Sequence, residues 1–284
     1  MSLGTRARGF VELTRPGNAV AAGVLTFTGA FVAGAAPGDA LVVVAAMLAT
    51  VFATGAGNAI NDYFDRDIDR INRPDRPIPR GAVTAAEAKW FSVALFGGAV
   101  VSAFVLPVVA IAIAVVNLVA LLAYTEFFKG LPGVGNVVVA ALTGSTFLFG
   151  GAAIGEPLGA VVLCVLAALA TLTREIVKDV EDIGGDREEG LRTLPIVVGE
   201  EASLWLGAVV LVVAVAASAV PFIWGGFGLA YLGVVVPADA VMLAAATRAF
   251  ADPAAAQRRL KYGMFLAAFA FIVGRATAQT GGTI

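Results

Sequence analysis

The chain has 284 residues, of which 59% are hydrophobic and only 14% are charged, and its formal net charge is −2. A soluble domain is closer to half apolar and a quarter charged, so this composition excludes an ordinary water-soluble protein. The chain contains no histidine, which excludes any mechanism that needs an imidazole base or metal ligand. Its single cysteine, Cys164, cannot form an intramolecular disulfide and is typical of a small buried side chain.

Nine apolar runs are each about as long as the roughly 20 residues that an α-helix needs to cross a bilayer. They cover residues 15–36, 39–60, 85–106, 107–125, 134–154, 157–177, 201–221, 225–248 and 255–277. Thr84 and Glu87 form a capping-box pattern, and Asp252 followed by Pro253 is typical of a helix start. The sequence therefore predicts an all-α membrane protein, in which residues 1–284 form one domain, a bundle of nine transmembrane helices.

The distribution of lysine and arginine predicts the orientation of this bundle. Basic residues occur in the N-terminal segment and in the connections after the second, fourth, sixth and eighth runs. The other connections carry none, and only Arg275 lies toward the other face. By the positive-inside rule, the N-terminus and two Asp-rich loops are cytoplasmic and the C-terminus is external. We therefore expect a multi-pass protein of the cell membrane.

The first polar cluster follows the second apolar run, at residues 58–80. Its carboxylates Asp62, Asp65 and Asp69 are spaced i, i+3 and i+7, which places them on one face of a helix. Like charges on one face repel, so a cation must neutralise them. A divalent metal is the natural candidate, because carboxylates and the amide of Asn61 are hard oxygen ligands that suit Mg²⁺.

The second polar cluster follows the sixth run and repeats this pattern. Asp179, Asp182 and Asp186 each lie 117 positions after their counterparts in the first cluster. The same separation predicts an internal repeat of a helix pair and its loop, covering approximately residues 39–85 and 157–200. A single cluster is as well explained by a solvated loop of mixed charge, but two clusters in register favour a shared site.

Both clusters are predicted at one membrane face, which favours a diphosphate bridged by a pair of Mg²⁺ ions between them. Polar groups near helix ends inside a membrane are costly unless they are used. Basic side chains can hold phosphate oxygens, although anchoring at the membrane surface explains some of them equally well. The candidate phosphate-binding residues are Arg66, Arg73, Arg76, Arg80, Lys178, Arg187 and Arg192. Asn58, Asn61 and Glu175, in the last turns of their helices, are further candidate substrate-binding residues.

The run NDYFDRDID at residues 61–69 resembles the NDxxDxxxD motif of the UbiA superfamily of intramembrane prenyltransferases. The run KDVEDIGGD at residues 178–186 is similar to the second aspartate motif of that superfamily. The nine predicted helices agree as well, so the resemblance covers essentially the whole chain. Within the superfamily, the two motifs most resemble those of archaeal digeranylgeranylglyceryl phosphate synthases. The absence of histidine fits the haem branch less well.

The resemblance implies a magnesium-dependent enzyme of archaeal ether-lipid synthesis. It would move a geranylgeranyl group from geranylgeranyl diphosphate to the glycerol hydroxyl of geranylgeranylglyceryl phosphate. The aspartates and Lys178 would form the catalytic centre, with metals and basic residues stabilising the diphosphate as it leaves. The expected partners are these two substrates and the membrane, with no nucleic acid and no obligate protein partner. Two alternatives are an aromatic acceptor, as in quinone or chlorophyll pathways, and a transporter whose carboxylates move cations.

Several further residues are candidates for contact with the substrates. Arg15 and Asn18 lie in an RPxN stretch that recurs in this family and could bind the acceptor head group, although snorkelling explains Arg15 equally well. Asp239 lies inside the eighth predicted helix, where a lone carboxylate is a functional candidate. It could pair with an arginine, or orient or deprotonate the acceptor hydroxyl. Tyr124 lies at the end of the fourth run and Lys129 in the loop that follows it, and both are candidate substrate contacts.

Overall fold

The computed structural model describes residues 3–128 and 130–279, and all regular secondary structure in these residues is helical. One long helix corresponds to each of the nine predicted apolar runs. These helices are α2 (Pro16–Ala33), α3 (Ala40–Phe64), α5 (Ala85–Ala103), α6 (Val108–Ala123), α7 (Val134–Ala153), α8 (Val161–Glu188), α10 (Glu200–Ala217), α12 (Leu229–Ala249) and α13 (Pro253–Gln279). The all-α membrane fold is thus confirmed.

Seven of these nine helices, in the part of the chain that is described, are both long and apolar enough to cross a membrane. The exceptions are α5, and α6, which is apolar but has only 16 residues. That all nine cross the membrane stays a prediction. Short helical segments connect the long ones: α1 (Leu3–Leu13), η1 (Pro37–Asp39), α4 (Arg66–Asn72), η2 (Tyr124–Phe128), η3 (Pro157–Ala160), α9 (Leu194–Val198) and α11 (Val220–Ile223).

Two of the predicted helix starts are confirmed by their capping hydrogen bonds. The Thr84 hydroxyl accepts a hydrogen bond from the Glu87 amide at 3.2 Å, and the Glu87 carboxylate accepts one from the Thr84 amide at 2.8 Å. At the start of α13, the Asp252 carboxylate accepts a hydrogen bond from the Ala255 amide at 2.9 Å. This hydrogen bond holds the pKa of Asp252 below its ordinary value. Local sequence therefore determines where these helices begin.

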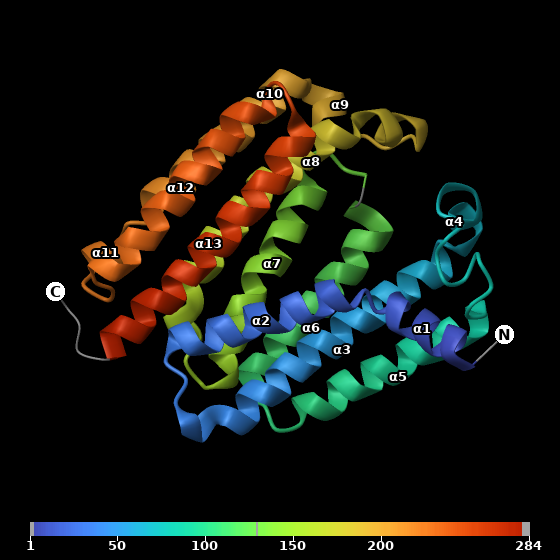
Figure 1. Ribbon diagram of the computed structural model, residues 1–284, viewed down its shortest axis with the longest axis horizontal. Coiled ribbons are helices and arrows are strands. Elements are labelled where there is room, and N and C mark those ends of the chain that lie inside the picture. Colours follow the sequence, from blue (N-terminus) through green and yellow to red (C-terminus); the bar gives the residue numbers. More distant parts are fainter. Residues whose placement is uncertain (1–2, 129, 280–284) are drawn as a thin grey trace.

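The long helices form two groups that meet in the middle of the bundle. In one group α3 packs against α2 and α5, and in the other α8 packs against α7 and α10, while α2 contacts α7 and α13 packs on α12 and α8. Figure 1 shows α4, α9 and the N-terminal end on one side, and α11 and the C-terminal end on the opposite side. The internal repeat and the orientation in the membrane stay predictions.

The contact between α2 and α7 joins the two groups and depends on two glycines. A Cβ atom on Gly29 would collide with the carbonyl of Phe147, and a Cβ atom on Gly150 would collide with the carbonyl of Thr26. The two backbones therefore approach more closely than any side chain permits. Small residues serve this purpose in membrane helices, where packing rather than the hydrophobic effect holds helices together.

Replacing Gly150 by alanine should therefore destabilise the protein. We expect Gly150→Ala to lower the free energy of unfolding by about 1–3 kcal/mol, because the helices must separate to admit the methyl group. The matched control is Gly233→Ala on α12, where a Cβ atom meets open space. Thermal unfolding in detergent compares the two variants, and equal melting temperatures would contradict the proposed close contact.

Candidate active site

The first aspartate motif lies where α3 gives way to α4. Helix α3 ends at Phe64, Asp65 is its C-terminal capping residue, and α4 begins at Arg66. The side chain of Asp65 is exposed, whereas those of Asp62 and Asp69 are buried. The expectation that all three carboxylates share one helical face is therefore corrected. Because the helix is interrupted at Asp65, only Asp62 and Asp69 contact one shared cation, the guanidinium group of Arg76.

Arginines neutralise the two buried carboxylates of the first motif. Arg76 Nη1 lies 2.5 Å from Asp69 Oδ2 and 3.3 Å from Asp62 Oδ1, and Arg15 Nη2 lies 2.7 Å from Asp62 Oδ1. The aspartate side chains are only 5% and 7% exposed, so unpaired charges there would be costly. The repulsion expected from the sequence is thus relieved in this structure by guanidinium groups.

Arg15 reaches Asp62 from an unusual backbone position. It precedes the first residue of α2 with φ = 47°, in the left-handed region, and is the one non-glycine residue with positive φ in the described chain. Such a conformation costs about 1–3 kcal/mol and is frequent at functional sites. The ion pair between Arg15 and Asp62 links the start of α2 to the end of α3, so Arg15 does more than snorkel to the membrane surface.

The second aspartate motif lies on a single helix, as predicted. Helix α8 continues without interruption to Glu188 and therefore carries Asp179, Asp182 and Asp186. Asn136 of α7 donates a hydrogen bond from Nδ2 to Asp179 Oδ2 at 2.8 Å. Sequence reasoning did not identify Asn136, because a lone asparagine in an apolar run carries no motif. The second motif is therefore held by a neutral amide rather than by arginines.

Tyr124 lies directly after the last residue of α6, near the second motif. Burial raises the pKa of its hydroxyl, and the neighbouring carboxylates Glu175, Asp179 and Asp186 raise it further. Tyr124 thus lies beside the second motif, where the sequence placed a candidate substrate contact. The neighbouring candidate Lys129 lies outside the described residues.

Some of the other candidate residues already form contacts within the protein, and others are exposed. The amide of Asn58 donates to the Thr14 carbonyl at 2.9 Å, and Arg80 Nη2 lies 2.5 Å from Glu12 Oε2. This hydrogen bond with Arg80 lowers the pKa of Glu12. Arg66 stacks on the ring of Tyr63. Five further candidates are exposed and therefore available to a ligand: Asn61, Arg73, Asp182, Arg187 and Arg192.

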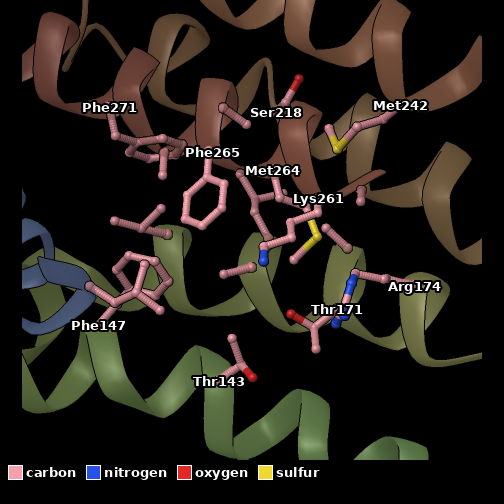
Figure 2. A pocket seen from close by; sticks show the side chains of 18 of the residues that line it. Thr143, Phe147, Thr171, Arg174, Ser218, Met242, Lys261, Met264, Phe265 and Phe271 are labelled. Carbon is pink, nitrogen blue, oxygen red and sulfur yellow. The ribbon is translucent and has the colours of Figure 1, made fainter. Parts of the chain in front are cut away.

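A cavity of about 310 Å³ lies between α8 and α13, with α2, α7, α10 and α12 completing its walls. Its volume is at the lower end of the range for small-molecule sites. Figure 2 shows apolar side chains on its walls, including Phe147, Phe265, Phe271, Met242 and Met264. The interior of the bundle can therefore enclose part of a long apolar molecule.

Three of the predicted site residues, Asn18, Glu175 and Asp239, line this cavity. Asp239 accepts a hydrogen bond from the Ser218 hydroxyl at 2.7 Å, instead of pairing with an arginine. Sequence reasoning missed the other polar groups that line the cavity. They are Thr143, Thr171, Arg174, Ser218 and Lys261. Arg174 and Lys261 counted there only as charges of one membrane face, because sequence does not show which way a side chain points.

Helix α8 connects the cavity to the second motif. Its cavity-lining residues are Leu163, Leu166, Ala167, Ala170, Thr171, Arg174 and Glu175. Steps of three and four residues place them on one helical face, and the same steps lead from Glu175 to Asp179, Asp182 and Asp186. The apolar chamber and the carboxylates therefore adjoin along a single surface of α8.

The carboxylates of the two motifs suit Mg²⁺ only if a substrate supplies some of the metal's ligands. In the described residues no group of three acidic, histidine or cysteine side chains is close enough to hold a metal ion. Mg²⁺ is commonly bound by one or two carboxylates, with waters and substrate phosphates as its other ligands. Asp62, Asp69 and Asp179 could each supply such a carboxylate, so the residues fit a metal that arrives with a phosphorylated ligand.

Comparisons with known proteins agree over nearly the whole chain. The sequence model of the UbiA prenyltransferase family matches residues 22–269. The chain is 64% identical to the digeranylgeranylglyceryl phosphate synthase of Natronomonas pharaonis, over 95% of this chain and 98% of that protein. A solved structure concerning digeranylgeranylglyceryl phosphate synthase in membranes is 33% identical, with a TM-score of 0.82 over 95% of this chain and 98% of that one. A UbiA homologue from Archaeoglobus fulgidus, bound to GPP and Mg²⁺, has the same fold at 18% identity, with a TM-score of 0.67 over 95% of this chain and 99% of that one.

Removing Arg76 should destabilise the protein, because two buried carboxylates would lose a shared cation. We expect Arg76→Gln to lower the free energy of unfolding by about 1–3 kcal/mol. The control is Arg70→Gln, whose partner Asp67 is exposed, so its effect should stay within about 0.5 kcal/mol. Thermal unfolding in detergent without added metal provides the measurement. If both variants melt together, Arg76 does not neutralise the motif.

Proposed function

The chain belongs to the UbiA prenyltransferase family, and on this premise we propose that it is a digeranylgeranylglyceryl phosphate synthase. It would transfer a geranylgeranyl group from geranylgeranyl diphosphate to the glycerol hydroxyl of geranylgeranylglyceryl phosphate. The observation that carries the proposal is the face of α8, on which the residues that line an apolar cavity are followed, one turn beyond Glu175, by the second aspartate motif. A prenyl diphosphate has the same two parts, a long apolar chain and a highly charged head.

In the proposed reaction the bond between the allylic carbon and the diphosphate oxygen breaks, and its electron pair leaves with the diphosphate. The glycerol hydroxyl oxygen then bonds to that carbon and loses its proton, which gives an ether. Positive charge near the diphosphate favours the first step, because negative charge develops there. Mg²⁺, as a pair of ions held by Asn61, Asp62 and Asp69 of the first motif and by the three aspartates of the second, would supply most of this charge.

Arg15 and Arg76 would then exchange partners when the diphosphate binds. Both guanidinium groups form ion pairs with Asp62 in the structure, and Arg76 also forms one with Asp69. Asp62 and Asp69 would then hold the metal, and the two arginines would be available to phosphate oxygens, for which their planar donors are well suited. The ion pairs would therefore keep the first motif ordered before the substrate arrives.

The cavity would hold the apolar chain and keep water away from the allylic cation. Of the two carboxylates on its walls, Glu175 already pairs with Arg174 at 2.7 Å and lies 3.8 Å from Lys178. Asp239 makes no ion pair within the described residues and is held by the Ser218 hydroxyl. Asp239 is therefore the better candidate to orient the acceptor hydroxyl or to take its proton. We place both aspartate motifs on the cytoplasmic side of the membrane.

Conservative substitutions in the motifs test the proposed metal site. Asp62→Asn and Asp179→Asn should each reduce kcat by roughly 100-fold or more, because a carboxylate that holds the leaving group's counter-charge is lost. The control is Asp67→Asn, an exposed aspartate between the motif positions that pairs with Arg70. Magnesium-dependent turnover with labelled geranylgeranyl diphosphate is the measurement. Full activity of both motif variants would refute the enzyme proposal and favour cation transport.

The acceptor is tested by supplying alternatives to the same membranes. Labelled geranylgeranyl diphosphate should yield product with geranylgeranylglyceryl phosphate, and none with an aromatic acceptor. Removal of divalent metal with a chelator should abolish turnover, and added Mg²⁺ should restore it. Product formed with the aromatic acceptor alone would assign the chain to another branch of the family.

A further inference from the structure

The cavity contains a polar group of three residues that the proposed reaction does not yet use. Arg174 and Thr171 project from α8 and Lys261 projects from α13. Figure 2 shows the nitrogen ends of Lys261 and Arg174 and the hydroxyl of Thr171 turned toward the same part of the cavity. We call these three residues the cavity triad. Its members come from two helices that lie far apart in the sequence.

Two atoms of the triad are buried without a hydrogen-bond partner among the described residues, namely Thr171 Oγ1 and Arg174 Nε. Thr171 is only 2% exposed, so no solvent compensates its hydroxyl. Leaving a buried polar group unpaired costs about 1–3 kcal/mol, and more if it is charged. Unused donors that face a cavity indicate a ligand that accepts hydrogen bonds there.

The cations of the triad keep unused donors although the cavity walls also carry two carboxylates, Glu175 and Asp239. Arg174 uses Nη1 to pair with Glu175 at 2.7 Å, which leaves its Nε free. Lys261 is exposed and makes no ion pair in the part of the chain described, and its Nζ lies 6.0 Å from the centre of the Phe265 ring. The free donors of Arg174, Lys261 and Thr171 favour an anion as the ligand.

We propose that the cavity triad binds the phosphate group of the acceptor, geranylgeranylglyceryl phosphate. A phosphate monoester offers three terminal oxygens, which match a lysine, an arginine and a hydroxyl as charge-assisted donors. This inference rests on the proposed function and identifies how the enzyme would recognise that acceptor.

The donor's diphosphate is the other possible source of the same anionic chemistry. We favour the acceptor because the aspartates that would hold the metal-bound diphosphate lie further along α8, beyond the cavity-lining residues that end at Glu175. The two sources differ in which substrate's KM responds to a change in the triad. If the triad binds the acceptor phosphate, triad variants should have no effect on turnover of an acceptor that lacks this phosphate.

The decisive comparison uses two acceptors that differ only in the phosphate, geranylgeranylglyceryl phosphate and geranylgeranylglycerol. Lys261→Gln should lower kcat/KM for the phosphorylated acceptor by roughly 10- to 100-fold, mainly through KM, because one charge-assisted hydrogen bond is lost. The same variant should leave kcat/KM for geranylgeranylglycerol and the KM of the donor unchanged. Thr171→Val should act in the same direction with a smaller effect.

The control is Arg259→Gln, which removes an exposed cation of α13 that does not line the cavity. It should behave as the wild-type protein with both acceptors. An equal loss for both acceptors, or a rise in the donor's KM, would overturn the assignment of the triad to the acceptor phosphate.

A binding measurement separates this inference from the proposed reaction. Without donor, geranylgeranylglyceryl phosphate should raise the melting temperature of the wild-type protein more than geranylgeranylglycerol does. Lys261→Gln should abolish that difference, and a difference that persists in the variant would refute the triad. If the wild-type protein turns over neither acceptor, the proposed function fails, while the melting temperatures still decide whether the triad binds a phosphate.

Discussion

The rest of this structure depends on one constraint: the carboxylates buried at the ends of apolar helices must have partners that neutralise or bind them. Asp62 and Asp69 are almost fully buried, and a bare carboxylate there would be unstable. Arg76 and Arg15 meet this requirement, and in doing so they join the start of α2, the end of α3, α4 and the segment that follows α4. One charge balance thus organises an entire end of the bundle.

The second motif meets the same constraint in a different way, which makes the two motifs unequal. Asp179 is held by the amide of Asn136, and the helix that carries it is continuous with the wall of the cavity. The buried carboxylates of the first motif are therefore paired with arginines before any ligand binds, whereas the second motif follows the cavity-lining residues of α8. A substrate with a charged head and a long chain would engage α8 along its length and the first motif through its head.

Much of this arrangement could be predicted because it is local in the sequence. The apolar runs located the long helices, and capping patterns at Thr84 and Asp252 located two of their starts. The spacing of the second motif correctly placed its aspartates on one helix. The same spacing misled at Asp65, because the spacing of carboxylates does not show that one helix ends there and the next begins. Asn136 and Thr171 escaped notice because single polar residues in apolar runs form no pattern, and Lys261 counted only as a charge of one membrane face.

The sequence by itself determined an all-helical membrane protein with paired aspartate motifs, since contiguous apolar residues must satisfy their backbone within helices. Only the tertiary structure decided which charges meet. Arg15 and Asp62 are 47 residues apart, and Asn136 and Asp179 are 43 apart. Lys261 and Arg174 reach one cavity from α13 and α8. Such contacts depend on how helices pack and which way side chains point, and neither is written in the order of residues along the chain.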